Sequence, residues 1–354
     1  MKVWLCMLCA ALCMTCGVRA ASRELSEALP EAADYLDSAE TYTPGDFSGG
    51  VGRILDGIRK QAGGVVRTRT RGAAAVLLSV VLCAAARSGC QADESASLCL
   101  SMAGALSVTA LTAGSLEQLI GLGWRTIAEL NTFSKALLPT LAAAVAASGA
   151  VSTATFQQVT ALFLVETLLN LMDSLLMPLT YLYIGLLTAS CTLPGNSLGV
   201  LADGLKKLIT SLLTWAVLAF TVYLSVCRIV TGNADGMALR AVRTAVTNTV
   251  PVVGGILAQV SESMVAGAGL LRNSIGVFGM LAVLSACAYP FLELGVQYLL
   301  YKAVAVLAAV TGMSDLCRLI DGLGAAFGLV LGMAGSCALL LFVAVLSFMA
   351  AVSA

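Results

Sequence analysis

Histidine is absent from the 354 residues of this chain, and charged residues make up only 11% of it. Without histidine the chain holds neither the HExxH motif of zinc proteases nor a serine–histidine catalytic pair. Its 20 basic residues balance its 20 acidic residues, so no excess positive charge indicates nucleic-acid binding. These absences exclude several classes of hydrolase and a nucleic-acid partner.

Motifs for other chemistries are missing as well. No GxxxxGK[ST] sequence is present, so energy for any transport has to come from a partner protein or an ion gradient. Of the 12 cysteines, four lie in the first 16 residues and the others are scattered singly, which does not suit a disulfide framework or a zinc site. We therefore expect no enzyme activity, metal or cofactor.

Apolar residues, by contrast, make up 59% of the chain, and its mean hydropathy is +0.93. Soluble proteins average about 45–50% apolar and about 25% charged residues. Hydrocarbon-rich stretches that cross a bilayer as helices satisfy their own backbone hydrogen bonds. The composition predicts an all-α, polytopic membrane helix bundle.

Charge and hydropathy divide the chain into three parts. Residues 1–21 contain one lysine, an apolar stretch and the small residue Ala20 near a possible cleavage site, which predicts a signal peptide or an uncleaved first anchor. Residues 22–71 carry many of the charges and are expected to form a polar extracytoplasmic segment. Residues 72–354 are expected to form the multi-span membrane domain.

The membrane domain contains nine apolar stretches that are candidates for crossing the bilayer. A crossing helix needs about 20 apolar residues, and Pro178 and Pro290 could each kink a helix or divide a hairpin. We expect seven to nine spans, with interfacial amphipathic helices at 115–130, 197–210 and 237–246. The candidate spans are 72–88, 96–114, 136–156, 159–190, 211–230, 250–271, 274–289, 291–310 and 324–351.

Several positions recur at a spacing of 112 residues. Pro139 is followed by Pro251 at this spacing, and Pro178 by Pro290. The pairs Asp203–Asp315 and Lys206–Arg318 share it. The spacing predicts a 112-residue tandem repeat with halves 128–240 and 241–352, although chance agreement among few prolines would give the same pattern.

Proline and glycine in apolar text mark possible breaks in membrane helices. Broken backbone at membrane depth requires protein or a water-filled cavity around it, and small residues allow helices to approach closely. These positions are therefore candidate broken-helix or gating elements: Pro139, Pro178, Pro251, Gly254, Gly255 and Pro290.

Polar residues also recur at helical spacing inside the candidate spans. Glu166, Asn170 and Asp173 share one helical face, Glu293, Gln297 and Tyr301 share another, and Glu262 stands alone. Charged side chains are unfavourable in mid-bilayer, so we expect these groups to face the bundle interior, a partner or a water-filled path. They could pair with Lys135, Arg272 or Lys302, or serve only to hold helices together.

Two stretches resemble the stage III sporulation protein AE family. They are "FSKALLPTLAAAVAASGAVSTA" at 133–154 and "AVTNTVPVVGGILAQVSESMVAGAGLLRNSIGVFG" at 245–279. A signal-like leader, a polar N-terminal segment and a multi-span region follow one another in the order that this family shows. The chain departs from the family pattern in its many cysteines, its short segment before the first span and Gln259.

The resemblance implies a multi-pass protein of the mother-cell membrane that surrounds the forespore, and a role as a subunit of a secretion-like channel. Implied partners are other stage III sporulation A proteins, among them a secretion-type ATPase and ring-forming subunits, and a forespore-side channel protein. A homo-oligomer is also possible. The family brings no catalytic residues and no cofactor.

Two functions remain open at this point. A non-enzymatic channel subunit explains the absent ATPase motif and the interfacial helices that could contact partners. A secondary transporter for a small solute explains the repeat and the intramembrane carboxylates equally well. Neutralising Glu166, Asp173 or Glu262 should abolish uptake by a transporter, whereas a channel subunit should depend on its partner-binding surfaces.

Overall fold

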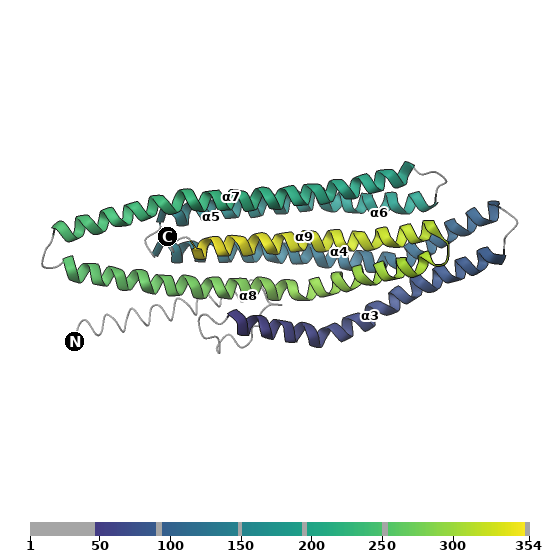
Figure 1. Ribbon diagram of the computed structural model, residues 1–354, viewed down its shortest axis with the longest axis horizontal. Coiled ribbons are helices and arrows are strands. Elements are labelled where there is room, and N and C mark those ends of the chain that lie inside the picture. Colours follow the sequence, from purple (N-terminus) through teal and green to yellow (C-terminus); the bar gives the residue numbers. More distant parts are fainter. Residues whose placement is uncertain (1–46, 90–93, 148–150, 193–196, 250–253, 351–354) are drawn as a thin grey trace.

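The computed structural model describes residues 47–89, 94–147, 151–192, 197–249 and 254–350. Within these ranges every element is helical, and the helices run back and forth along one long axis (Figure 1). The elements are α3 (Phe47–Gly89), α4 (Glu94–Ala147), α5 (Val151–Leu171), the π-helical segment η2 (Met172–Leu176), α6 (Met177–Thr192), α7 (Ser197–Thr249), α8 (Gly254–Ala309) and α9 (Ser314–Ala350).

Six of the described helical stretches are long and apolar enough to cross a membrane. The all-α architecture expected from composition is confirmed for the described residues, but seven to nine spans are not, because the nine candidate stretches fall in six long helices. Candidates 96–114 and 136–156 both fall largely in α4, and three further candidates fall in α8. The 54 residues of α4 extend about 80 Å at 1.5 Å per residue, well beyond the roughly 30 Å hydrocarbon layer.

The prolines explain part of this difference, because none of the three described inside helices ends its helix. Helix α4 continues through Pro139, and α8 continues through Pro290. Before Pro178, η2 widens the helix by one residue, so that the Met177 N–H donates to the carbonyl of Met172. A π turn of this kind accommodates a residue that cannot continue the regular hydrogen-bond ladder. Neither Pro178 nor Pro290 divides a hairpin.

The predicted interfacial helices are likewise parts of longer helices. Residues 115–130 form the middle of α4, 197–210 begin α7, and 237–246 lie near its end. The predicted boundary at residues 71–72 falls inside α3, which runs from the charged segment into the apolar one without interruption. The predicted leader at 1–21 lies outside the described residues.

The tandem repeat is not confirmed. A shift by 112 residues would superimpose α7 on α9, but α7 has 53 residues and α9 has 37. The connections between helices also fail to recur at the 112-residue spacing, since α7 begins at Ser197 and α9 at Ser314.

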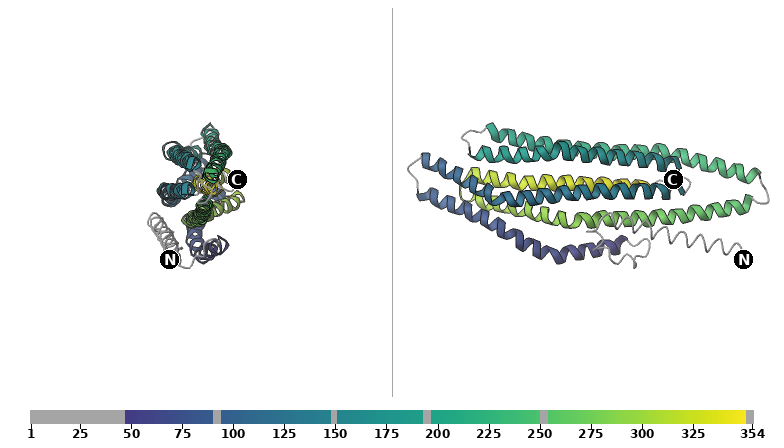
Figure 2. Two further views of the ribbon diagram at one scale, coloured as in Figure 1. Left: turned by 90° about the vertical axis from the view of Figure 1, so that its left-hand side faces the viewer. Right: turned by 180° about the vertical axis from the view of Figure 1, so that it is seen from behind.

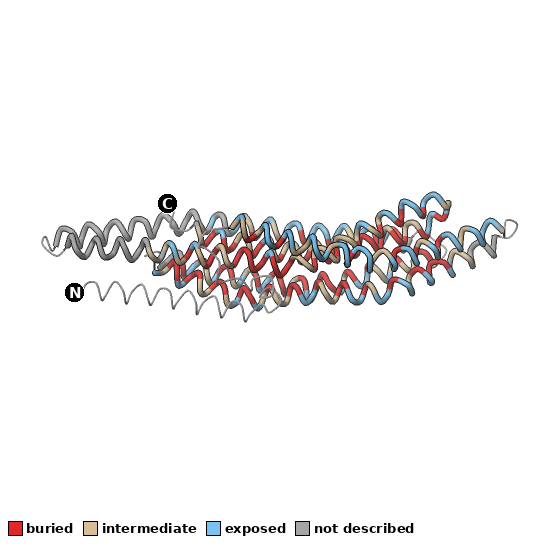
Figure 3. The backbone as a smooth tube through the Cα atoms, turned by 90° about the horizontal axis from the view of Figure 1, so that it is seen from below, coloured by how far each residue is buried: buried red, intermediate tan, exposed pale blue. Residues whose placement is uncertain are grey.

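Helix α9 forms the centre of the bundle. It contacts α4, α5, α6, α7 and α8, and the end-on view shows these helices arranged around it (Figure 2). Its inward stripe is fully buried and follows helical spacing. Figure 3 shows buried positions recurring along the middle of the bundle. The stripe consists of Leu316, Leu319, Leu323, Phe327, Val330 and Ala334.

Glycines set the close approach of α9 to its neighbours. A Cβ atom at Gly123 of α4 would collide with Val330, and one at Gly322 of α9 would collide with Leu187 of α6. The turn between α8 and α9 contains Gly312 with φ +73°, a conformation that favours glycine. Small residues thus let these long helices pack side by side.

Candidate functional site

A partly buried polar cluster joins α3, α4 and α8. At its centre the Arg69 guanidinium donates from Nη2 to Oε2 of Glu293 at 2.9 Å, and the Tyr289 hydroxyl donates to Oε1 of the same carboxylate at 2.6 Å. The side chains of Arg69 and Glu293 are only 15% and 12% exposed. This ion pair therefore holds α3 against the bundle from inside.

Further polar side chains of the cluster follow at successive turns of α8. Gln297 is 2% exposed, and its Oε1 has no hydrogen-bond partner. The Tyr301 hydroxyl lies 3.2 Å from Oγ1 of Thr112 on α4. The rings of Tyr301 and Phe327 pack edge to face, with their centroids 5.2 Å apart. The interior position predicted for Glu293, Gln297 and Tyr301 from their spacing is what the structure shows.

The other predicted polar face points away from the bundle. Glu166, Asn170 and Asp173 are all exposed on α5 and η2, so they do not face the interior of this chain; contact with a partner or a water-filled path, the other surroundings expected for them, remains a prediction. Glu166 lies 3.8 Å from Lys135, and the Trp124 indole N–H donates to Asp173 at 2.9 Å. Helix α5 is apolar on nearly every side, so periodicity alone could not orient it.

The three predicted cationic partners differ in their surroundings. Lys135 pairs with Glu166 as expected, whereas Lys302 pairs with Asp321. Arg272 is 7% exposed, and its Nε and Nη1 have no hydrogen-bond partner. Within the described residues no group of three histidine, cysteine, aspartate or glutamate side chains could hold a metal ion.

A profile of the family described as stage III sporulation protein AE matches residues 37–352. The chain belongs to the stage III sporulation protein AE family. The resemblance inferred from two sequence stretches is thereby confirmed, and family membership implies a role in sporulation. No solved structure matches the chain.

The chain is similar to the curated stage III sporulation protein AE of Bacillus subtilis (strain 168). The two are 25% identical over 211 residues, which cover 60% of this chain and 53% of the relative. The matched region thus spans about half the length of the curated relative.

The broken-helix candidates of this family member occupy varied places. Pro139 is partly buried and Pro178 is exposed, both within continuous helix, and Pro290 is buried inside α8. Gly254 and Gly255 begin α8. Pro251 lies outside the described residues, as does the side chain of Glu262. A gating role for these positions remains a prediction.

Sequence reasoning missed Arg69 although a signal for it was present. Arg69 lies at helical spacing on the buried stripe of α3 that contains Val65, Ala73, Val76 and Val80, whereas the neighbouring Arg67 and Arg71 are exposed. An arginine on an apolar stripe indicates a buried partner. Thr112 carried no comparable signal.

The contact between Tyr301 and Thr112 leads to a small predicted effect. Interhelical hydrogen bonds in membrane proteins average about 0.6 kcal/mol, so Tyr301→Phe should lower the free energy of unfolding by about that amount. Thr112 keeps its own bond to the Val108 carbonyl. Unfolding of the purified protein in detergent would measure this, with Thr112→Val and the double variant completing a mutant cycle. Additive effects of the two single variants would contradict a direct contact.

Proposed function

We propose that this chain is a non-enzymatic integral membrane subunit of a secretion-like channel complex that connects mother cell and forespore during endospore formation. The observation that carries the proposal is the family match over residues 37–352, nearly the whole chain. The six long apolar helices support a multi-pass subunit. The membrane proposed for it is the mother-cell membrane that surrounds the forespore.

The proposed partners follow from the family. They are other stage III sporulation A proteins, including a secretion-type ATPase and ring-forming subunits, and a forespore-side channel protein. A partner ATPase suits a chain without a nucleotide-binding motif of its own. The family is one of sporulation components and is not a known enzyme family.

The alternative function as a secondary transporter finds less support in the bundle. A coupled transporter needs carboxylates along an interior path, but Glu166 and Asp173 lie on the outer surface. Glu293 does lie inside, where it is held by Arg69 and Tyr289. We therefore do not extend the proposal to solute transport.

Deletion of the gene in its native host, with a tagged copy restored, tests the proposed function. We expect engulfment to finish, forespores then to shrink, and the tagged protein to form a ring around the forespore. Restoration of the full chain should return spore formation to the level of the parent strain. Normal spore yield in the deletion strain, with the protein spread over the vegetative membrane, would overturn the proposal.

A further inference from the structure

A line of basic side chains runs along the outer side of α3, the helix at the edge of the bundle (Figure 1). Spacings of seven and four residues place these side chains on one helical face. Asp56 is the single acidic residue between Phe47 and Gly89. We call the line the α3 basic stripe, and it consists of the exposed residues Arg53, Lys60, Arg67 and Arg71.

The stripe points away from the bundle, as its relation to Arg69 shows. Arg69 is turned toward α8, where it donates to Glu293. Arg67 and Arg71 each stand two residues from Arg69, and two residues turn the direction of a helical side chain by about 200°. The stripe therefore lies on the side of α3 opposite to α4 and α8, with which α3 makes its main contacts.

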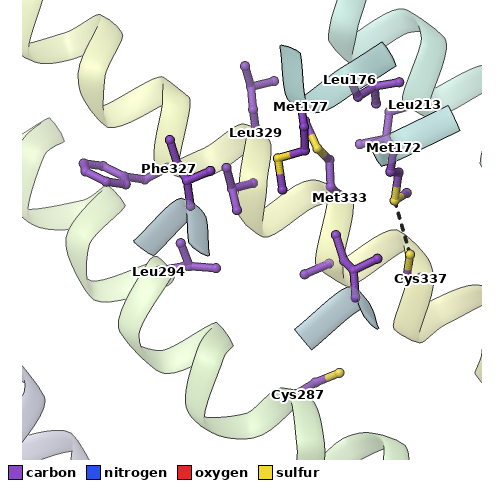
Figure 4. Packing of buried hydrophobic residues seen from close by; sticks show 14 of the residues in the cluster. Met172, Leu176, Met177, Leu213, Cys287, Leu294, Phe327, Leu329, Met333 and Cys337 are labelled. Atoms are coloured by element: carbon purple, nitrogen blue, oxygen red, sulfur yellow. Dashed lines mark hydrogen bonds between the residues drawn. The ribbon is translucent and has the colours of Figure 1, made fainter. Parts of the chain in front are cut away.

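The positive charge of the stripe is not balanced by the part of the chain that the structure describes. Lys60, Arg67 and Arg71 take part in none of the salt bridges found among the described residues. The carboxylate of Glu293 is engaged with Arg69. The core between α8 and α9 consists of apolar and sulfur-containing side chains (Figure 4). The stripe is therefore a positive surface that attracts an anionic group.

Exposed glycines accompany the stripe. Gly64 lies on the same face, between Lys60 and Arg67, and Gly63 lies next to it. A Cβ atom at either glycine would meet nothing within 4 Å. Glycine inside a helix is less favourable than alanine, but it allows another backbone to come close. The outer side of α3 therefore suits contact with a further polypeptide segment.

Lipid headgroups can cover only part of this surface. From Arg53 to Arg71 the stripe extends about 27 Å at 1.5 Å per residue, parallel to the long axis along which the helices run. The headgroup region is about 5–8 Å thick on each side of the hydrocarbon layer. A bilayer crossed along that axis thus meets about one turn of the stripe. An acidic polypeptide that runs along α3 accounts for its whole length.

We propose that the acidic segment 22–46 of the same chain, which lies outside the described residues, docks on the α3 basic stripe. The segment joins α3 directly at Phe47, so it is held near the stripe at high effective concentration. Opposite charge and this direct tether favour it over a separate partner. Its only basic residue is Arg23, and its acidic residues are Glu24, Glu27, Glu31, Asp34, Asp37, Glu40 and Asp46.

The segment is long enough to reach the whole stripe. Arg71 lies about 36 Å along the helix from Phe47 at 1.5 Å per residue. An extended chain covers up to about 3.3–3.6 Å per residue, so residues 31–46 can carry Glu31 as far as Arg71. A separate acidic partner would reach the stripe only by displacing this segment. The inference concerns a contact within one chain and does not rest on the channel role.

A photocrosslinking residue at Asp56 tests the contact in the full-length protein in its membrane. Asp56 is exposed one turn from both Arg53 and Lys60, and its replacement removes no basic residue. We expect a crosslink to residues 22–46, identified by mass spectrometry of peptides, in a product that keeps the mass of one chain. Leu78 is the matched control, because it lies on the same face beyond the stripe and is 60% exposed; no crosslink to the segment is expected from it.

Charge reversal shows whether the crosslink from Asp56 depends on attraction between the segment and the stripe. Lys60→Glu with Arg67→Glu should lower its yield about tenfold, because each change turns an attraction into a repulsion. Glu31→Lys with Asp34→Lys should lower the yield similarly. All four changes together should restore it, which a local defect in either element would not do.

The proposal is overturned by any of several results. One is the absence of a crosslink from Asp56 to the segment, including crosslinks only to lipid, to another protein or to a second copy. Another is an unchanged yield in both charge-reversed variants. A third is a yield that stays low when all four charges are exchanged.

Discussion

Replacement of Arg69 by alanine should destabilise the protein by up to about 3 kcal/mol, because removing one partner of a largely buried ion pair leaves the other charge with little compensation. The stranded group is Glu293, whose side chain is 12% exposed. Helix α3 would also lose its buried ion pair with α8. Thermal unfolding of the purified protein in detergent, together with its level in the membrane, would measure the loss.

The matched control is Arg71→Ala, two residues further along α3, where the side chain is exposed. It should leave the free energy of unfolding nearly unchanged. Replacing both partners, with Arg69→Met and Glu293→Leu together, should recover most of the stability, since apolar residues of similar size often substitute well for a buried pair. Equal effects of Arg69→Ala and Arg71→Ala would contradict the buried ion pair.

Replacement of Gly123 by leucine should be comparably severe. A side chain there would collide with Val330 of α9, and overpacking a tight core typically costs about 1–3 kcal/mol and occasionally more. Because α9 contacts most of the other helices, displacement at this point should disturb the whole bundle. Protein yield from the membrane and the unfolding midpoint would report the effect.

Gly121→Leu is the matched control for this prediction. A Cβ atom at Gly121 meets nothing within 4 Å, so the same substitution two residues earlier should be tolerated. Val330→Ala should partly restore the Gly123→Leu variant by making room for it, although alone it would leave a small cavity. If Val330→Ala deepened the defect instead, the close approach of α4 to α9 would not be the cause.

The polar residues show what helical spacing can predict and what it cannot. On α8 the spacing of Glu293, Gln297 and Tyr301 predicted one face, and that face lies inside the bundle next to Arg69 and Thr112. On α5 and η2 the spacing of Glu166 and Asp173 was equally regular, but these residues lie on the outer surface. Spacing tells which residues share a face, and only packing against neighbouring helices decides where the face points.

The number of membrane crossings is a second property that the sequence alone did not predict correctly. Hydropathy identified apolar stretches correctly, but a short polar or proline-containing segment between two of them reads equally well as a loop or as the middle of one helix. Pro139 and Pro290 were expected to mark breaks, and both lie in continuous helices. Helix breakers are tolerated in membrane helices where neighbouring groups satisfy the freed backbone atoms.

The sequence by itself determined that this protein is a helical membrane protein of the stage III sporulation protein AE family. Composition accounts for the helical membrane part, because long apolar helices satisfy their own backbone hydrogen bonds in lipid, whereas the stretches at 133–154 and 245–279 carry the family resemblance. Only the tertiary structure decided that α9 is central, that Arg69 reaches Glu293, and that Glu166 and Asp173 lie on the outer surface. These depend on the rotation and register of each helix, which are set by side-chain packing between helices far apart in the chain.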